Sequence, residues 1–253
     1  METLLRLALV PAAVWLASLA ARRWGHTVSG YLGGMPLIGG PITFFLAIDQ
    51  GAAFAAQSAM VTLAAILGQA AHLLAFSHAA RWKRWSVALA AGWSGYFVVS
   101  TAIAQLPLTP LFALALALGG LILAWLYLPR PSDAPSLPLI PAAELWLRLV
   151  AAFALAILIV SSAEAFGPIV SGVLLSLPVT GSIMPPFTLA LYGAGALARL
   201  MRGFVVGLAG FTAFFFVVAA TVVPWGVAAA FTVAIAAALV GVSVARRLAL
   251  RRR

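Results

Sequence analysis

The chain lacks cysteine and is poor in charged residues, above all acidic ones. None of its 253 residues is cysteine, and only five are Asp or Glu, against fifteen Lys or Arg. Without cysteine, disulfides, thiol nucleophiles and thiolate metal sites are excluded. The sequence also contains no metal-spaced His/Asp/Glu cluster, no phosphate-binding loop and too few acids for a two-carboxylate hydrolase. We therefore expect no enzyme activity, no cofactor, no metal site and no ATP-driven mechanism within this chain.

What is abundant is apolar sequence. Hydrophobic residues make up 64% of the chain, charged residues only 8%, and the mean hydropathy is +1.13. This composition predicts an all-α polytopic membrane protein whose main partner is the lipid bilayer. A net charge of +10 would suggest nucleic-acid binding in a soluble protein. Here the basic residues lie between apolar runs, so we interpret them as topology signals and expect no nucleic-acid partner.

The apolar runs predict about nine transmembrane helices of roughly 20 residues each. Their approximate bounds are residues 4–21, 27–48, 54–78, 85–105, 109–128, 144–163, 168–190, 203–223 and 226–245. The run 4–21 also has the length of a signal-peptide core. Its basic residues follow the run, however, and it has a counterpart in the second half, so we assign it as the first span.

Charge supports the count of nine. With nine crossings the basic residues on one face are Arg22, Arg23, Arg81, Lys83, Arg84, Arg130, Arg148, Arg199, Arg202, Arg246, Arg247 and Arg251 to Arg253, and only Arg6 lies opposite. If the two glycine- and proline-rich segments re-entered without crossing, seven spans would remain and this asymmetry would mostly vanish. Because basic loops favour the cytoplasm, we expect nine crossings in a bacterial-type inner membrane, with the amino terminus outside and the carboxyl terminus cytoplasmic.

The sequence contains an internal repeat. Its first copy includes Val28, Ser29, Gly30, Leu32, Pro36 and Gly39, and its second copy includes Val170, Ser171, Gly172, Leu174, Pro178 and Gly181. The predicted organisation is a four-helix repeat over residues 1–105, a linker helix and Pro-rich cytoplasmic strap over 106–143, and a second four-helix repeat with a basic tail over 144–253. Because an odd number of crossings separates equivalent helices, the second repeat is expected to be inverted.

Each repeat contains one helix that we expect to be broken, over residues 27–48 and 168–190. Proline removes a backbone donor and glycine tolerates unusual dihedral angles, so backbone groups freed there need protein, water or a ligand as partners. The predicted substrate-binding residues are Ser29, Gly33, Gly34, Pro36, Gly39, Gly40, Thr43, Ser171, Ser176, Pro178, Thr180, Gly181 and Ser182. The alternative is that these small residues only permit close helix packing.

Few titratable groups qualify for ion coupling. His72 is the only such side chain expected well inside a span, as a coupling or ligand-contacting group or else as a packing histidine. Asp49 and Glu164 end spans on the outer face, as coupling carboxylates or merely solvated ones. The polar face of the span 85–105 is expected to line the cavity wall through Gly92, Ser94, Gly95, Tyr96, Ser100 and Thr101. The run Phe211 to Phe216 is interpreted as lipid-facing or as core packing, without a site role.

In its architecture the chain resembles secondary transporters built from inverted repeats with discontinuous helices. We therefore predict a secondary transporter that moves a small neutral or anionic solute by alternating access. The alternatives are a lipid flippase or scramblase that binds a headgroup, and a non-transporting integral assembly subunit. A monomer and a homodimer are both compatible with a chain of this size.

Overall fold

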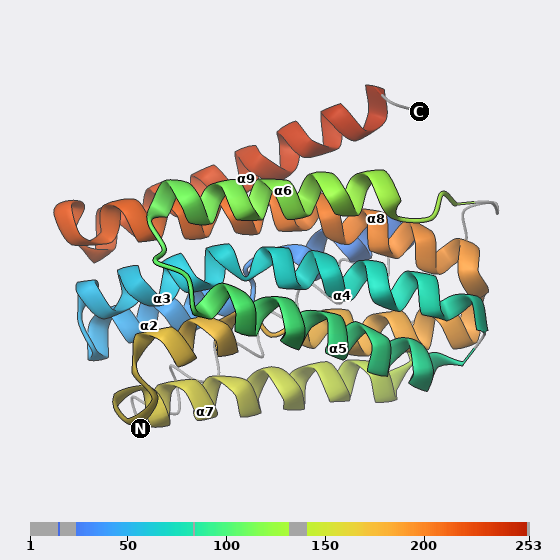
Figure 1. Ribbon diagram of the computed structural model, residues 1–253, viewed down its shortest axis with the longest axis horizontal. Helices are drawn as coiled ribbons and strands as arrows, with labels where there is room; N and C mark the ends of the chain where they lie inside the picture. The colour runs from blue at the N-terminus through green and yellow to red at the C-terminus, as the bar shows by residue number, and fades with distance from the viewer. Residues whose placement is uncertain (1–14, 16–23, 83, 132–140, 252–253) are drawn as a thin grey trace.

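The computed structural model describes residues 15, 24–82, 84–131 and 141–251 (Figure 1). In this part of the chain every regular element is helical, and seven helices are long and apolar enough to cross a membrane. The prediction of an all-α polytopic membrane protein is confirmed at this level. The predicted first span, 4–21, and the strap residues 132–140 lie outside the described residues.

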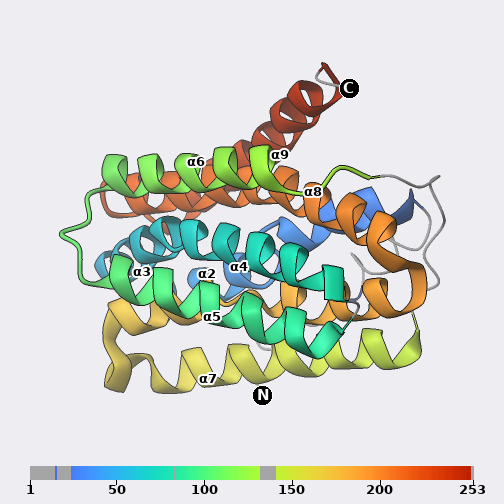
Figure 2. The same cartoon turned by 45° about the vertical axis from the view of Figure 1, so that its right-hand side comes forward.

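The helices follow the apolar runs of the sequence. Residues 24–34 are helical and precede α2. The further elements are α2 (Gly39–Asp49), α3 (Ala52–Ala64), α4 (Ile66–Ala79), the 3-10 turn η1 (Ala80–Trp82), α5 (Trp85–Ala104), α6 (Pro110–Tyr127), α7 (Ala142–Leu175), α8 (Val179–Trp225) and α9 (Val227–Arg251). Most of them lie along the long axis of the molecule, while the carboxyl-terminal part of α9 projects away from the bundle (Figures 1 and 2).

The two halves share backbone interruptions at equivalent glycines. Gly25 and Gly167 have φ values of 86° and 69°, and Gly51 and Gly193 have φ values of 92° and 76°. Only glycine adopts such angles without steric cost, so the sequence repeat corresponds to a repeat in the backbone. The kink at Gly193 also corrects one predicted boundary, because the helix after it continues through residues 194–225 instead of beginning at 203.

Both predicted helix breaks are present. Residues 35–38 interrupt the helix between 34 and the start of α2, and residues 176–178 separate α7 from α8. Pro36 and Pro178 lie inside these two segments. A proline lacks the amide hydrogen and obstructs the preceding turn, which explains why each helix stops here.

The helix over residues 24–34 packs closely on α8 through two pairs of glycines. A Cβ atom added at Gly30 would collide with the backbone of Leu200 and Gly203, and one added at Gly34 would collide with the backbone around Gly207. Seen from α8, Gly203 and Gly207 face the backbone of residues 27–34 in the same way. Two glycines spaced by four on each helix allow this close backbone approach.

The second half repeats this arrangement with partners from the first. A Cβ atom added at Gly172 would collide with the carbonyl oxygen of Ser58 on α3. Two hydroxyls strengthen this contact: Ser58 Oγ donates to the Pro168 carbonyl at 3.1 Å, and Thr62 Oγ1 donates to the Gly172 carbonyl at 3.0 Å. Gly172 is equivalent to Gly30, and Ser58 is equivalent to Leu200. Each broken helix thus packs against a helix of the other half.

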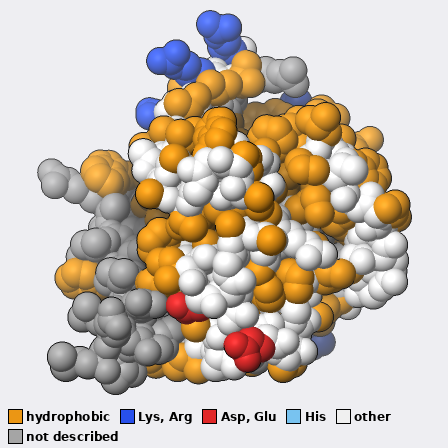
Figure 3. Space-filling model, turned by 90° about the vertical axis from the view of Figure 1, so that its left-hand side faces the viewer, with side chains coloured by type: hydrophobic (Ala, Val, Ile, Leu, Met, Phe, Trp, Pro, Cys, Tyr) orange, Lys and Arg blue, Asp and Glu red, His pale blue; other side chains and the backbone are white. Residues whose placement is uncertain are grey.

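The molecular surface matches a protein held in a bilayer. Exposed indoles lie at or near helix ends at Trp24, Trp82, Trp85, Trp146 and Trp225, the depth at which tryptophan meets lipid headgroups. Figure 3 shows the end of the molecule that is at the left of Figure 1, where acidic side chains lie among apolar ones and the visible basic side chains are confined to the margins.

Candidate functional site

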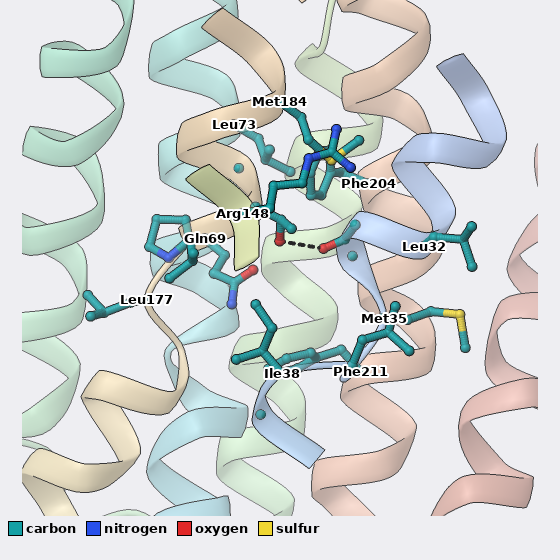
Figure 4. Close-up of a pocket in the computed structure, with 18 of the residues that line it drawn as sticks. Leu32, Met35, Ile38, Gln69, Leu73, Arg148, Leu177, Met184, Phe204 and Phe211 are labelled. Carbon is teal, nitrogen blue, oxygen red and sulfur yellow. Dashed lines mark hydrogen bonds between the residues drawn. The ribbon is translucent and has the colours of Figure 1, made fainter. Parts of the chain in front are cut away.

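The two helix breaks border one cavity at the centre of the bundle (Figure 4). Its volume is about 60 Å³, which is enough for only a few water molecules. The lining residues from the first break and its flanks are Ser29, Leu32, Gly33, Gly34, Met35, Leu37, Ile38 and Gly39, and those from the second are Leu175, Leu177, Pro178, Val179, Thr180, Gly181 and Met184. Gln69, Leu73, Arg148, Leu155, Phe204 and Phe211 complete the lining.

A hydrogen bond joins the two breaks directly. Thr180 Oγ1, in the first turn of α8, donates to the Gly33 carbonyl at 2.9 Å, the bond drawn in Figure 4. Gly33 lies in the last turn before the first break, where carbonyls lose their helical partners. The hydroxyl of one half therefore satisfies a backbone group released by the break in the other half.

Helix α4 satisfies the second break with two polar side chains. Gln69 Nε2 donates to the Ser176 carbonyl at 2.9 Å. His72 Nε2 lies 3.1 Å from the Gly181 carbonyl, so the imidazole carries its proton on Nε2 to donate this bond. His72 is fully buried and stands edge-on to the Trp93 ring, at 6.1 Å between ring centroids. It contacts the turn after the break and is not part of the cavity lining.

Tyr96 on α5 supports the same break from outside the cavity. Its hydroxyl donates to the Val173 carbonyl at 2.9 Å and lies 2.7 Å from Ser176 Oγ. The expectation that the polar face of 85–105 lines the cavity is wrong, because none of its six residues is in the lining. Tyr96 instead holds the end of α7 in place, since α5 packs behind the break.

The first break is contacted by aromatic side chains, where the second break has polar ones. The positions equivalent to Gln69 and His72 are Phe211 and Phe214 on α8. A Cβ atom added at Gly40 would lie 3.4 Å from the Phe214 ring, and Phe211 lines the cavity. The interpretation of Phe211 to Phe216 as mere packing is therefore wrong for Phe211. The second break is therefore bonded by polar side chains of α4, whereas the first break faces aromatic side chains of α8.

A buried ion pair lies at the edge of the cavity. Arg148 pairs with Glu144 one helical turn earlier on α7, and only 4% and 5% of these residues are exposed. Arg148 also lines the cavity, where Figure 4 shows its side chain extending toward Met184 and Phe204. The prediction that His72 is the only titratable side chain well inside a span is wrong. The sequence does contain a signal for this ion pair, because Glu144 and Arg148 are opposite charges spaced by four residues within an apolar run.

The structure brings together seven of the predicted substrate-binding residues. Those that line the cavity are Ser29, Gly33, Gly34, Gly39, Pro178, Thr180 and Gly181. Pro36, Gly40, Thr43, Ser171 and Ser176 lie outside the lining, and Thr43 donates to the Gly39 carbonyl of its own helix at 2.7 Å. Ser182 lies instead on a separate apolar groove.

The two coupling carboxylates are not brought to the cavity. Asp49 is the last residue of α2 and Glu164 lies shortly before the kink at Gly167, and both are exposed. In the described part of the chain, no three His, Asp or Glu residues are grouped so that they could hold a metal ion.

No protein-family model, curated protein or solved structure matches this chain.

Proposed function

We propose that this protein is a secondary transporter that moves a small neutral or anionic solute by alternating access around its two broken helices. The observation that carries the proposal is the cavity bordered by both breaks. Irregular backbone inside a bilayer is tolerated where it is buried in protein or lines a space for water or solute. Two such segments around one small space form the arrangement in which transporters of this architecture bind their solute.

The contacts between the halves support an inverted, two-fold arrangement of repeats. Gly30 meets the carbonyl of Leu200, and the equivalent Gly172 meets the carbonyl of Ser58, the equivalent of Leu200. Such reciprocal contacts are expected of two similar units related by a two-fold axis. In addition, α5 and α9 are equivalent in the repeat and run in opposite directions in Figure 1. Both observations favour repeats that enter the membrane from opposite faces.

The size of the cavity supports alternating access over a permanent pore. A volume of about 60 Å³ accepts only a few water molecules, and we propose that this arrangement is the closed state of the cycle. Opening to either side requires the halves to separate at Thr180 and Gly33, which are joined by one hydrogen bond. The glycine contacts of Gly30 and Gly203 have no side chains that interlock. We propose that the broken helices rock along these contacts.

The charge distribution supports the proposed orientation in a bacterial-type inner membrane. The exposed acids Asp49 and Glu164 lie at one end of the bundle, whereas Arg81, Arg84 and Arg130 belong to connections at the other end. Basic connections favour the cytoplasmic side. We therefore propose that the carboxyl terminus is cytoplasmic and that the amino terminus is outside.

Flux into vesicles tests the proposal. The purified protein is reconstituted into phosphatidylethanolamine and phosphatidylglycerol vesicles, and uptake of labelled acetate, phosphate and glycine is followed under an imposed proton or sodium gradient. We expect at least one solute to enter, and Pro178→Ala to lower the initial rate. Pro110→Ala, at the start of α6 and outside the cavity lining, is the matched control. Absence of flux for every solute, with no effect of Pro178→Ala, would remove the proposal.

One observation favours lipid translocation as a second candidate. A groove of about 370 Å³ next to the second break is lined by Trp85, Leu89, Leu147, Ser182, Ile183, Pro186, Phe187 and Ala190. Its lining is mainly apolar, as an acyl chain would require. Dithionite quenching of a fluorescent phosphatidylethanolamine in the same vesicles distinguishes the two functions, because headgroup translocation without solute flux supports the lipid pathway only.

A further inference from the structure

The charge of the cavity lining narrows the class of solute. Among the described lining residues Arg148 is the one charged side chain, and no carboxylate belongs to the lining. Glu144, its ion-pair partner, lies one turn away and outside the lining. The other polar side chains of the lining are Ser29, Gln69 and Thr180, which are neutral. Among the described lining residues, a solute that enters this space therefore meets one cationic side chain and several neutral hydrogen-bonding groups.

The ion pair holds Arg148 in a position suited to recognition. Arg148 and Glu144 are both almost completely buried, so the guanidinium keeps its charge in a low-dielectric environment beside a carboxylate. A guanidinium carries five N–H donors in a planar fork whose geometry matches a carboxylate or a phosphate. Charged residues inside a membrane protein usually mark a pathway or a ligand site.

Two helix starts add to the positive potential. Gly39 is the first residue of α2 and Val179 is the first residue of α8, and both line the cavity. No described side chain caps either start. The amides of a helix start favour negative charge. The partial positive charge of these amides has the same sign as the charge of the Arg148 guanidinium. The main evidence for an anion site is the position of Arg148 in the lining.

We propose that the cavity binds a small anion, a carboxylate or an inorganic oxyanion, and that Arg148 is the residue that selects it. This inference rests on the proposed transport function for its biological meaning, whereas binding itself can be measured without transport. The small volume of the cavity restricts the charged group to a few atoms in this closed state. Gln69 is placed to contact the same group, because it lines the cavity and its amide has a second N–H besides the one donated to the Ser176 carbonyl.

Anion-dependent thermal stability of the detergent-solubilised full chain tests the proposal. Acetate is compared with acetamide, its uncharged isostere, at matched ionic strength, and phosphate is measured as the oxyanion. Because phosphate stabilises most proteins by exclusion from their surface, the readout is the difference between wild type and variant. The variants are Arg148→Gln, Arg148→Lys and the double variant Glu144→Gln/Arg148→Gln, which removes both charges and leaves no carboxylate without its cation. Arg202→Gln is the control, because Arg202 donates to the Leu128 and Pro129 carbonyls outside the cavity.

We expect acetate or phosphate to stabilise the wild type beyond acetamide, with an apparent affinity that falls about tenfold or more in Arg148→Gln and in the double variant. Arg148→Lys should retain part of the effect and Arg202→Gln all of it. The inference is overturned if neither anion exceeds acetamide, or if the anion effect survives in a folded variant without the Arg148 guanidinium. Binding that depends on Arg148 without flux in vesicles would leave this inference standing and would overturn only the transport proposal.

Discussion

Thr180 and Gly33, which belong to opposite halves of the chain, are joined by a hydrogen bond of 2.9 Å from Thr180 Oγ1 to the Gly33 carbonyl. The bond has no counterpart by symmetry, because the position equivalent to Thr180 is Ile38, which has no donor. One side chain thus bridges the two breaks at the cavity. Under the proposed alternating-access mechanism, Thr180 is the most direct place to change the balance between closed and open states.

Removing this hydroxyl should open the cavity. Thr180→Val keeps the shape of the side chain and leaves the Gly33 carbonyl without its donor, which we expect to cost about 1 kcal/mol of the closed state. Because the chain has no cysteine, Leu177→Cys in the cavity lining provides a single reporter thiol. Its alkylation by a small water-soluble maleimide should be several-fold faster in Thr180→Val than in the parent.

Two controls define that result. Thr180→Ser retains the hydroxyl and should alkylate at the parent rate. Thr232→Val removes an exposed hydroxyl that donates to Ala228 on its own helix, α9, and should have no effect either. Equal alkylation rates in all variants would show that the Thr180 to Gly33 bond does not limit opening.

The bond from Gln69 to the second break should matter for stability. Gln69→Leu leaves the Ser176 carbonyl without the donor it has at 2.9 Å, and an unsatisfied buried carbonyl costs about 1–3 kcal/mol. We expect this loss in the free energy of unfolding measured by titration with sodium dodecyl sulfate. Gln57→Leu, an exposed position on α3, should stay within about 0.5 kcal/mol of the wild type. A similar loss for both variants would contradict the role given to Gln69.

The helix breaks could be predicted because their cause is local. Pro36 and Pro178 lack the amide hydrogen and lie in the segments where the helices are interrupted, and glycines at Gly25 and Gly167 permit the positive φ angles found there. The same reasoning selected Thr180, which lies in the lining of the cavity. These features depend on residue type and spacing more than on packing partners.

The features that were missed depend on tertiary contacts. From the sequence we expect Arg148 to be a basic residue on the cytoplasmic face. In the structure, Glu144 and the surrounding helices bury it beside the cavity. Phe211 lines the cavity only because the second half packs against the first break. The start of the helix at 194 was placed too late because Arg199 was expected in a loop, whereas it is 8% exposed within α8. Hydropathy averages over such residues and cannot report which neighbours enclose them.

The glycine contact between the halves should tolerate no side chain. A methyl group at Gly203 would collide with the carbonyl of Thr27 and approach Gly30, so the helices must separate. Overpacking of this kind costs about 1–3 kcal/mol or more, and we expect Gly203→Ala to lower the melting temperature of the purified protein. Gly119 on α6 has no atom within 4 Å of an added methyl.

Gly119→Ala is therefore the matched control, and alanine there should be neutral or stabilising by about 0.5–1 kcal/mol because it is the better helix former. Equal melting temperatures for the two variants would mean that the contact between Gly30 and Gly203 adjusts freely. In that case these glycines would not constrain how the broken helix can move.

The buried pair of Glu144 and Arg148 should show strong coupling in stability. Glu144→Gln removes the carboxylate that faces the buried guanidinium, and breaking such a pair typically costs about 3–5 kcal/mol. Replacing both charges with apolar side chains, in Glu144→Leu/Arg148→Met, removes the desolvation cost along with the attraction and should cost much less. A double-mutant cycle of these positions, measured by detergent unfolding, is therefore expected to be non-additive by more than about 1 kcal/mol. Additive effects would mean that each residue is stabilised by other contacts, so Glu144 would not hold Arg148 at the cavity. Because the cycle reads only stability, its result is independent of whether any solute crosses the membrane.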